Sequence, residues 1–98
     1  MKIIKRNGTE VVFDLNKIKN AIKKANEGVL ESERMSNEQI EVIAENVENA
    51  CANVKRSLSV EEIQDRVEDQ IMNQKAFDVA RNYITYRYII FTFFSSHN

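Results

Sequence analysis

The residues of this sequence that could do chemistry are a few cations near its N-terminus. Lys5 and Arg6 precede the pair Asn7-Gly8, and Lys17 follows a little further along the chain. Cationic side chains and the free backbone N–H groups of a helix N-terminus both favour anions, so a turn and a helix start that carry them can hold phosphates. Charged residues beside a turn are also commonly just solvated. Because no Gly-rich phosphate loop of the Walker or Rossmann kind is present, a kinase or dehydrogenase is not indicated.

The distribution of charge also places an anion site near the N-terminus. The chain has 14 basic and 15 acidic residues and a net charge of −1. Residues 1–24 hold seven basic and two acidic residues, a net of +5, which leaves −6 for the remainder. A total charge near zero argues against a globally basic nucleic-acid binder.

Residue types that commonly carry catalysis or bind metals are scarce. Cys51 falls on an apolar helical stripe and is expected to be a buried small hydrophobe rather than a nucleophile. His97 lies in a polar tail, and one cysteine with one histidine cannot form a zinc site. The following acidic residues are interpreted as first-turn and solvent-face charges of a helix: Glu61, Glu62, Glu68 and Asp69. Neither a catalytic residue nor a metal site is therefore predicted.

A β-hairpin and a helix are expected to position the cations. Short β-prone runs at 3–4 and 11–13 flank the Asn-Gly pair, which is favoured in type I′ hairpin turns. From Asp14, interpreted as an N-cap, apolar residues recur at helical spacing towards Gly28, interpreted as a C′ residue. Lys5, Arg6 and Lys17 would then lie close to the hairpin turn and the helix start.

Two capping boxes predict the next two helices. Ser36 with Gln39 begins one helix, and Ser59 with Glu62 begins another. The apolar stripe of the earlier helix contains Ile40, Ile43, Ala44, Val47, Ala50, Cys51 and Val54, and that of the later one Ile63, Val67 and Ile71. Residues 55–58 could supply a short strand, but nothing in the pattern proves its pairing.

A fourth helix is predicted from about Lys75, with four residues on its buried face: Phe77, Ala80, Ile84 and Tyr88. Residues 88–94 are then almost continuously apolar and uncharged. This segment either packs against something absent from the chain or marks the cut end of a longer protein. We therefore divide the chain into a domain at 1–88 and an apolar tail at 89–98, which is a truncation scar or an interface segment.

Length and composition indicate one soluble, helix-rich domain in the cytoplasm. The chain has 98 residues and no proline, and 43% of its residues are hydrophobic. Charge appears too early for a signal peptide, and no apolar run reaches the roughly 20 residues of a membrane span.

Three segments in order resemble the ATP-cone family. They are Ile-Ile-Lys-Arg-Asn-Gly at 3–8, Val-Phe-Asp-Leu-Asn-Lys-Ile at 12–18 and Ala-Arg-Asn-Tyr-Ile-Thr-Tyr-Arg at 80–87. The stretch at 60–72 is similar to the version in anaerobic, class III ribonucleoside-triphosphate reductases. The resemblance implies an α+β fold, mainly α: a four-helix bundle capped by a small three-stranded β-sheet.

The resemblance also implies a nucleotide site between the sheet and the helix tips. Lys5 and Lys17 match phosphate contacts, with Arg6 close by, while Ile3 and Ile18 match positions that line the base. Gln64 matches a residue that helps recognise the nucleoside, and Arg87 matches an arginine of the closing motif. Where that motif has a second basic residue, positions 89 and 90 are both isoleucine.

The implied function is regulation rather than catalysis. ATP or dATP, with or without Mg²⁺, would be the allosteric ligand, and no redox cofactor would bind to this chain. The implied partner is the catalytic portion of an anaerobic ribonucleotide reductase, and the apolar tail is expected to mediate self-association. Two alternatives are the same domain in a repressor of reductase genes, which carries a zinc ribbon ahead of the cone, and a helical interaction domain without nucleotide.

Overall fold

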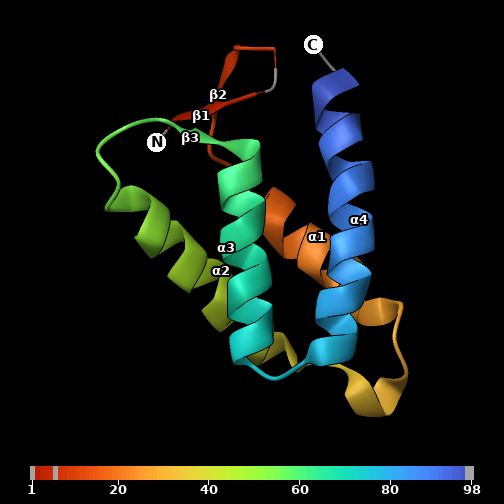
Figure 1. Ribbon diagram of the computed structural model, residues 1–98. Coiled ribbons are helices and arrows are strands. Elements are labelled where there is room, and N and C mark those ends of the chain that lie inside the picture. Colours follow the sequence, from red (N-terminus) through yellow and green to blue (C-terminus); the bar gives the residue numbers. More distant parts are fainter. Residues whose placement is uncertain (1, 6, 97–98) are drawn as a thin grey trace.

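A hairpin, a short third strand and four helices follow one another along the chain (Figure 1). In the computed structural model the backbone is described for residues 2–5 and 7–96, and side chains to residue 87. In chain order the elements are β1 (Lys2–Ile4), β2 (Glu10–Val12), α1 (Leu15–Glu27), the 3-10 helix η1 (Glu31–Glu33), α2 (Asn37–Ala52), β3 (Leu58–Ser59), α3 (Val60–Asn73) and α4 (Phe77–Ser96). The predicted fold class is confirmed: the protein is mainly helical, with four helices and a small three-stranded sheet.

The sheet has the order β2-β1-β3 and is mixed. β1 pairs antiparallel with β2, with Ile3 opposite Val11, and parallel with β3, with Ile3 opposite Leu58. The predicted hairpin is therefore confirmed, and the segment before α3 does supply a strand. β3 is only two residues long because Ser59, its second residue, is also the N-cap of α3.

The hairpin turn is not the type I′ turn that Asn-Gly pairs favour. The Gly8 amide donates to the Lys5 carbonyl at 2.9 Å, and the Lys5 amide donates to the Thr9 carbonyl at 2.8 Å. Because the first of these bonds closes a turn that runs from Lys5 to Gly8, Asn7 and Gly8 are not its two central residues, as they would be in a type I′ Asn-Gly turn. Gly8 instead ends this turn, with a φ of +87°.

The predicted helix starts are confirmed. Asp14 Oδ1 accepts from the Asn16 amide at 3.0 Å at the start of α1. Both capping boxes are formed, by Ser36 with Gln39 and by Ser59 with Glu62. Because each cap satisfies backbone N–H groups that the first turn leaves unpaired, these helix starts are set by local sequence.

Gly28 ends α1 as its C-cap rather than as the C′ residue that the sequence indicated, and it is not in the left-handed conformation typical of a C′ glycine. Its φ is −79°. A Cβ atom at this position would lie 2.3 Å from Asn82 Nδ2, which donates to the Ala25 carbonyl at 2.8 Å. A larger side chain at position 28 would therefore push the Asn82 amide out of this hydrogen bond between α4 and α1.

The predicted buried face of α4 is wrong in part. Phe77 and Ile84 are 48% and 52% exposed, whereas Val79, Ala80 and Tyr83 are buried. The side chain of Tyr88 lies outside the described residues. The apolar residues among 77–87 spread over a wide arc of α4, so periodicity alone cannot identify which part of that arc packs against α1 and α3. The helix continues through the apolar segment to Ser96.

The buried residues form one core between the helices and beneath the sheet. Cys51 belongs to this core, as predicted, and burial raises the pKa of its thiol, against the opposing effect of Arg66. The largest fully buried side chains are Tyr83, Ile22, Ile40, Ile43, Leu58 and Ile71. The helices and the sheet therefore share one hydrophobic core.

Candidate functional site

Four elements meet at the sheet end of the bundle. In Figure 1 the strands lie above the start of α3, and the end of α4 rises beside them. Only Phe13 and the N-cap Asp14 separate β2 from the start of α1, and β3 leads directly into α3. The N-termini of α1 and α3 therefore both lie near the sheet, where the positive ends of their helix dipoles favour an anion.

The predicted base-lining residues lie on two of these elements. Ile3 is buried in the middle of β1, between Val11 and Leu58 of the neighbouring strands. Ile18 is half-buried in the first turns of α1 and packs against the same core cluster. Ile3 is thus part of the hydrophobic core, and Ile18 packs against that core from α1.

The predicted phosphate ligands lie at the edge of the same region. Lys5 follows β1 directly and is half-buried, and Lys17 lies in the first turn of α1 with an exposed side chain. Arg6, the third predicted cation, lies outside the described residues. By contrast, Lys19 lies on the side of α1 that faces α2, where it forms an ion pair with Glu41 at 2.8 Å. The positive charge of the N-terminal segment is therefore divided between the sheet end and the α1–α2 contact.

Gln64, the predicted nucleoside contact, is buried on α3 and only 6% exposed. Its Oε1 accepts a hydrogen bond from the hydroxyl of Tyr83, a buried residue of α4. Burial raises the pKa of Tyr83 further above its ordinary value, so the phenol is protonated at neutral pH and acts as the donor. This polar pair lies between α3 and α4, one turn of α4 below Arg87.

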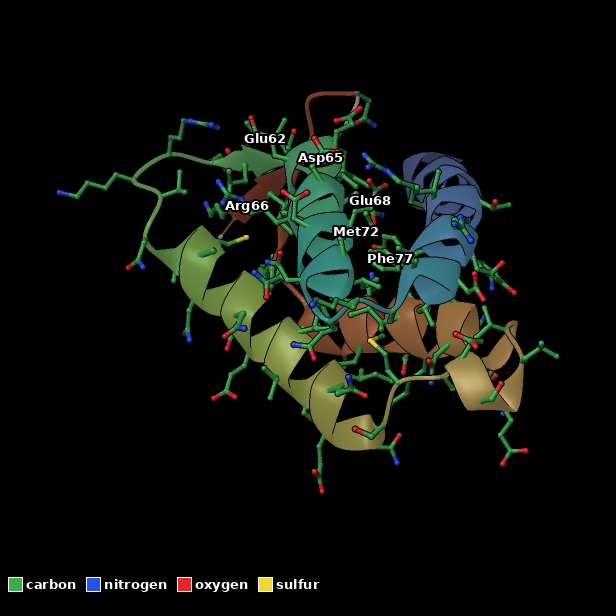
Figure 2. All side chains as sticks on the ribbon, turned by 60° about the horizontal axis from the view of Figure 1, so that its bottom comes forward. Glu62, Asp65, Arg66, Glu68, Met72 and Phe77 are labelled. Carbon is green, nitrogen blue, oxygen red and sulfur yellow. The ribbon has the colours of Figure 1, made fainter. Side chains whose placement is uncertain are left out.

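Arg87 makes several polar contacts with α3. Its Nη1 donates to Asp65 Oδ1 at 2.7 Å and to Glu68 Oε1 at 2.5 Å, and its Nη2 donates to the Glu61 carbonyl at 3.4 Å. Burial opposes the charge of Arg87, but the hydrogen bonds with Glu68 and Asp65 outweigh it and hold its pKa above the usual value. We call Arg87, Asp65 and Glu68 the Arg87 cluster; Figure 2 labels its two carboxylates on α3.

The carboxylates of the Arg87 cluster were missed by the sequence reasoning. Glu68 was expected on the solvent face, yet its side chain is only 22% exposed. The i, i+3 spacing of Asp65 and Glu68 places both on one side of a helix, which is a usable signal. Their partner could not be found from that spacing, because it lies on another helix.

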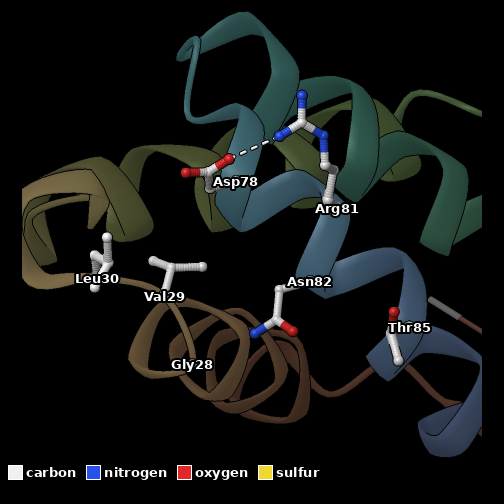
Figure 3. A pocket seen from close by; sticks show the side chains of 7 residues that line it. All are labelled: Gly28, Val29, Leu30, Asp78, Arg81, Asn82 and Thr85. Atoms are coloured by element: carbon white, nitrogen blue, oxygen red, sulfur yellow. Dashed lines mark hydrogen bonds and ion pairs between the residues drawn. The ribbon is translucent and has the colours of Figure 1, made fainter.

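A cavity of about 460 Å³ lies elsewhere, between the end of α1 and the outer side of α4 (Figure 3). It is lined by Gly28, Val29, Leu30, Asp78, Arg81, Asn82 and Thr85. Arg81 and Asp78 form an exposed ion pair at 2.7 Å across part of its wall. None of the predicted nucleotide-binding residues that the structure describes lines this cavity, so its size alone does not make it the functional site.

Neither a metal-binding cluster nor a membrane-spanning helix occurs in the described part of the chain. No group of three or more His, Cys, Asp or Glu side chains in this part of the chain is placed to hold a metal ion. None of its helices has the length and apolar character required to cross a membrane. His97 lies outside the described residues.

Comparison with known proteins gives one family and several relatives. A family model described as the ATP cone domain matches residues 1–89. The alpha subunit of ribonucleoside-diphosphate reductase from Chlamydia trachomatis is 35% identical over 95 residues, which cover 89% of this chain and 9% of that protein. The vitamin B12-dependent ribonucleoside-diphosphate reductase of Thermoplasma acidophilum is 41% identical over 91 residues, covering 88% and 11%.

A third relative is the anaerobic ribonucleoside-triphosphate reductase of Haemophilus influenzae, which is 36% identical over 87 residues, covering 88% of this chain and 12% of that protein. The chain thus spans between 9% and 12% of the length of these curated relatives. Because diphosphate and triphosphate reductases both occur among them, the anaerobic class is not singled out.

Proposed function

Because this chain belongs to the ATP-cone family, we propose that it is the allosteric domain through which ATP and dATP set the activity of a ribonucleotide reductase. The family match over residues 1–89 is the observation that carries the proposal. The meeting of a basic hairpin and two helix N-termini at one end of the bundle supports it independently, because such a place favours phosphates. Chemistry at the reductase active site would then belong to another part of the protein.

The proposed ligands are the residues named from the sequence: Ile3, Lys5, Arg6, Lys17, Ile18, Gln64 and Arg87. Lys5, Arg6 and Lys17 would bind the phosphates, for which charge-assisted hydrogen bonds are the strongest contacts. Ile3 and Ile18 would pack against the adenine, and Gln64 would recognise the nucleoside from the floor of the site. Apolar walls with a few placed polar groups are typical of small-molecule sites.

A switch of this kind needs differential binding. ATP and dATP differ by one 2′-hydroxyl, and a ligand shifts an equilibrium only by the difference between its affinities for the two states. We therefore propose that the domain has two arrangements relative to the reductase, one favoured by ATP and the other by dATP. ATP would favour the active arrangement and dATP the inactive one.

Titration calorimetry with the isolated chain tests the site. We expect Lys5→Ala and Lys17→Ala each to weaken ATP binding by about 1–3 kcal/mol, the range for hydrogen bonds to charged groups. Lys24→Ala is the matched control, because it removes the same charge from the last turn of α1, at the far end of that helix from the sheet. If all three variants bound ATP equally, Lys5 and Lys17 would not be phosphate ligands.

Nucleotide preference tests the base-binding part of the proposal. Thermal-shift measurements with and without Mg²⁺ should show more stabilisation by ATP and dATP than by GTP. Equal stabilisation by GTP would argue against an adenine site.

We further propose that the parent enzyme is an anaerobic triphosphate reductase. The resemblance of residues 60–72 to that class supports this, and the Haemophilus influenzae relative is consistent with it. The complete reading frame tests the assignment directly, because a diphosphate reductase domain after this chain would contradict it.

A further inference from the structure

We propose that Asp65 and Glu68 compete with the nucleotide phosphates for Arg87, so that binding separates Arg87 from α3 and frees the end of α4. This rests on the proposed function, because it requires a phosphate ligand at the sheet end. It adds two carboxylates that weaken nucleotide binding. It also explains how nucleotide binding would change the last helix, α4.

The geometry shows that Arg87 is held to α3 by several contacts. One nitrogen, Nη1, contacts both carboxylates, at 2.7 Å and 2.5 Å, and Nη2 contacts the Glu61 carbonyl. The side chains of Arg87 and Glu68 are each only 22% exposed, whereas the Arg81–Asp78 pair on the same helix is 76% and 46% exposed. A partly buried charge-assisted pair is stronger than an exposed one. Turning Arg87 towards a phosphate would therefore cost its contacts with Asp65 and Glu68.

The charges of the Arg87 cluster define the competition. One guanidinium faces two carboxylates, so the cluster carries a net negative charge when Arg87 is bound to α3. Asp65 and Glu68 keep their charge when Arg87 turns away, so a phosphate must attract the guanidinium more strongly than these two carboxylates do. The carboxylates should therefore reduce nucleotide affinity by holding Arg87.

The position of the cluster explains what its opening would change. Below it, α3 and α4 are joined by the Tyr83–Gln64 hydrogen bond and then by buried apolar residues such as Val67 and Val79. Above it, α4 continues for nine residues to Ser96, whereas α3 has already begun at Val60. Arg87 is thus the last described side chain that ties α4 to α3. Its release would loosen the end of α4, the element that leads out of the bundle.

Calorimetry with charge-neutral variants tests the competition. We expect D65N/E68Q to bind ATP about five- to tenfold more tightly than the unaltered chain, since a partly buried charge-assisted contact contributes on the order of 1 kcal/mol. E45Q/D69N is the matched control, because it makes the same two chemical changes at exposed positions on α2 and α3. The control should change affinity less than twofold.

A double-mutant cycle separates competition from simple repulsion. If Asp65 and Glu68 act by holding Arg87, the gain from D65N/E68Q should disappear when R87Q is also present. The same gain with and without R87Q would overturn the proposal, because it would show that the carboxylates only repel the ligand. Unchanged affinity in D65N/E68Q, with Lys5→Ala still weakening binding, would overturn it while leaving the proposed function intact. Lack of ATP binding by every variant would overturn both.

Hydrogen–deuterium exchange gives a second readout that does not depend on folding of the R87Q variant. Amides of residues 88–96 should exchange severalfold faster in D65N/E68Q than in E45Q/D69N without ligand. ATP should produce a similar increase in the unaltered chain. Unchanged exchange in both experiments would show that the Arg87 cluster does not control the end of α4.

Discussion

Loss of the Tyr83–Gln64 hydrogen bond is predicted to destabilise the protein, because both partners are buried. Tyr83 is 1% exposed and Gln64 is 6% exposed, so neither group can replace a lost partner with bulk water. Tyr83→Phe keeps the ring in the core but removes the donor, which leaves Gln64 Oε1 buried without it. A buried polar group left unsatisfied costs about 1–3 kcal/mol, more than the net value of an ordinary hydrogen bond. We expect Tyr83→Phe to lower the free energy of unfolding by that amount.

The same reasoning predicts strong coupling between the two positions. Gln64→Leu alone should cost a similar amount, because it strands the Tyr83 hydroxyl. The double variant Y83F/Q64L removes both polar groups and should be close to the unaltered chain, since replacing both partners by apolar groups can be nearly neutral. The coupling energy should then be on the order of 2 kcal/mol.

Urea unfolding followed by far-UV circular dichroism measures all of these variants. Tyr86→Phe is the control, because Tyr86 is a half-buried tyrosine of the same helix, and it should change stability by less than about 0.5 kcal/mol. The reasoning would be refuted if Tyr83→Phe matched this control, or if the losses from the two single variants simply added in the double variant.

Three further predictions concern local packing, pH and association. Gly28→Ala should destabilise the fold by about 1 kcal/mol, because the new Cβ would meet Asn82 Nδ2 at 2.3 Å and displace it from its hydrogen bond with the Ala25 carbonyl, and an unchanged melting temperature would contradict this. The hydrogen bond from Arg56 lowers the pKa of Glu62 below 4.5, so its stabilisation is present above that pH and is lost as the pH falls through the folded-state pKa. Glu62→Gln keeps a capping-box residue but should flatten the acid limb of the stability profile, and an unaltered acid limb would exclude this ion pair as its source. Deleting residues 89–98 should lower the oligomeric state measured by light scattering, because an apolar helix end favours a second copy as its cover, and a monomeric intact chain would disprove self-association.

The elements that depend on neighbouring residues were predictable from the sequence. Asp14, Ser36 and Ser59 cap their helices because each accepts hydrogen bonds from amides two or three positions along the chain. The hairpin follows from two short β-prone runs around a glycine that can adopt positive φ. Cys51 was predicted to be buried because its helix carries one clear apolar stripe. In each case the information lies within a few turns of chain.

The candidate site was also predictable from the sequence, through motifs rather than through geometry. Short segments around Lys5, Lys17 and Arg87 indicate an ATP-cone, and the family model confirms that membership over residues 1–89. Their individual roles in nucleotide binding stay predictions. The spacing of these residues along the chain says nothing of the partners that they have before a ligand arrives.

Tertiary structure decided which side of each helix meets its neighbours. The predicted burial of Phe77 and Ile84 is wrong because α4 is apolar on several sides, and contacts with α1 and α3 choose among them. Glycine is favoured at position 28 because the Asn82 side chain, more than fifty residues away in sequence, lies against it, and not because of its own φ. The sequence alone indicates that Glu68 is a surface charge, whereas in the structure α4 places Arg87 within hydrogen-bond distance of it. Caps and turns are determined by neighbours in sequence, whereas helix faces and ion pairs between helices are determined only when distant segments pack together.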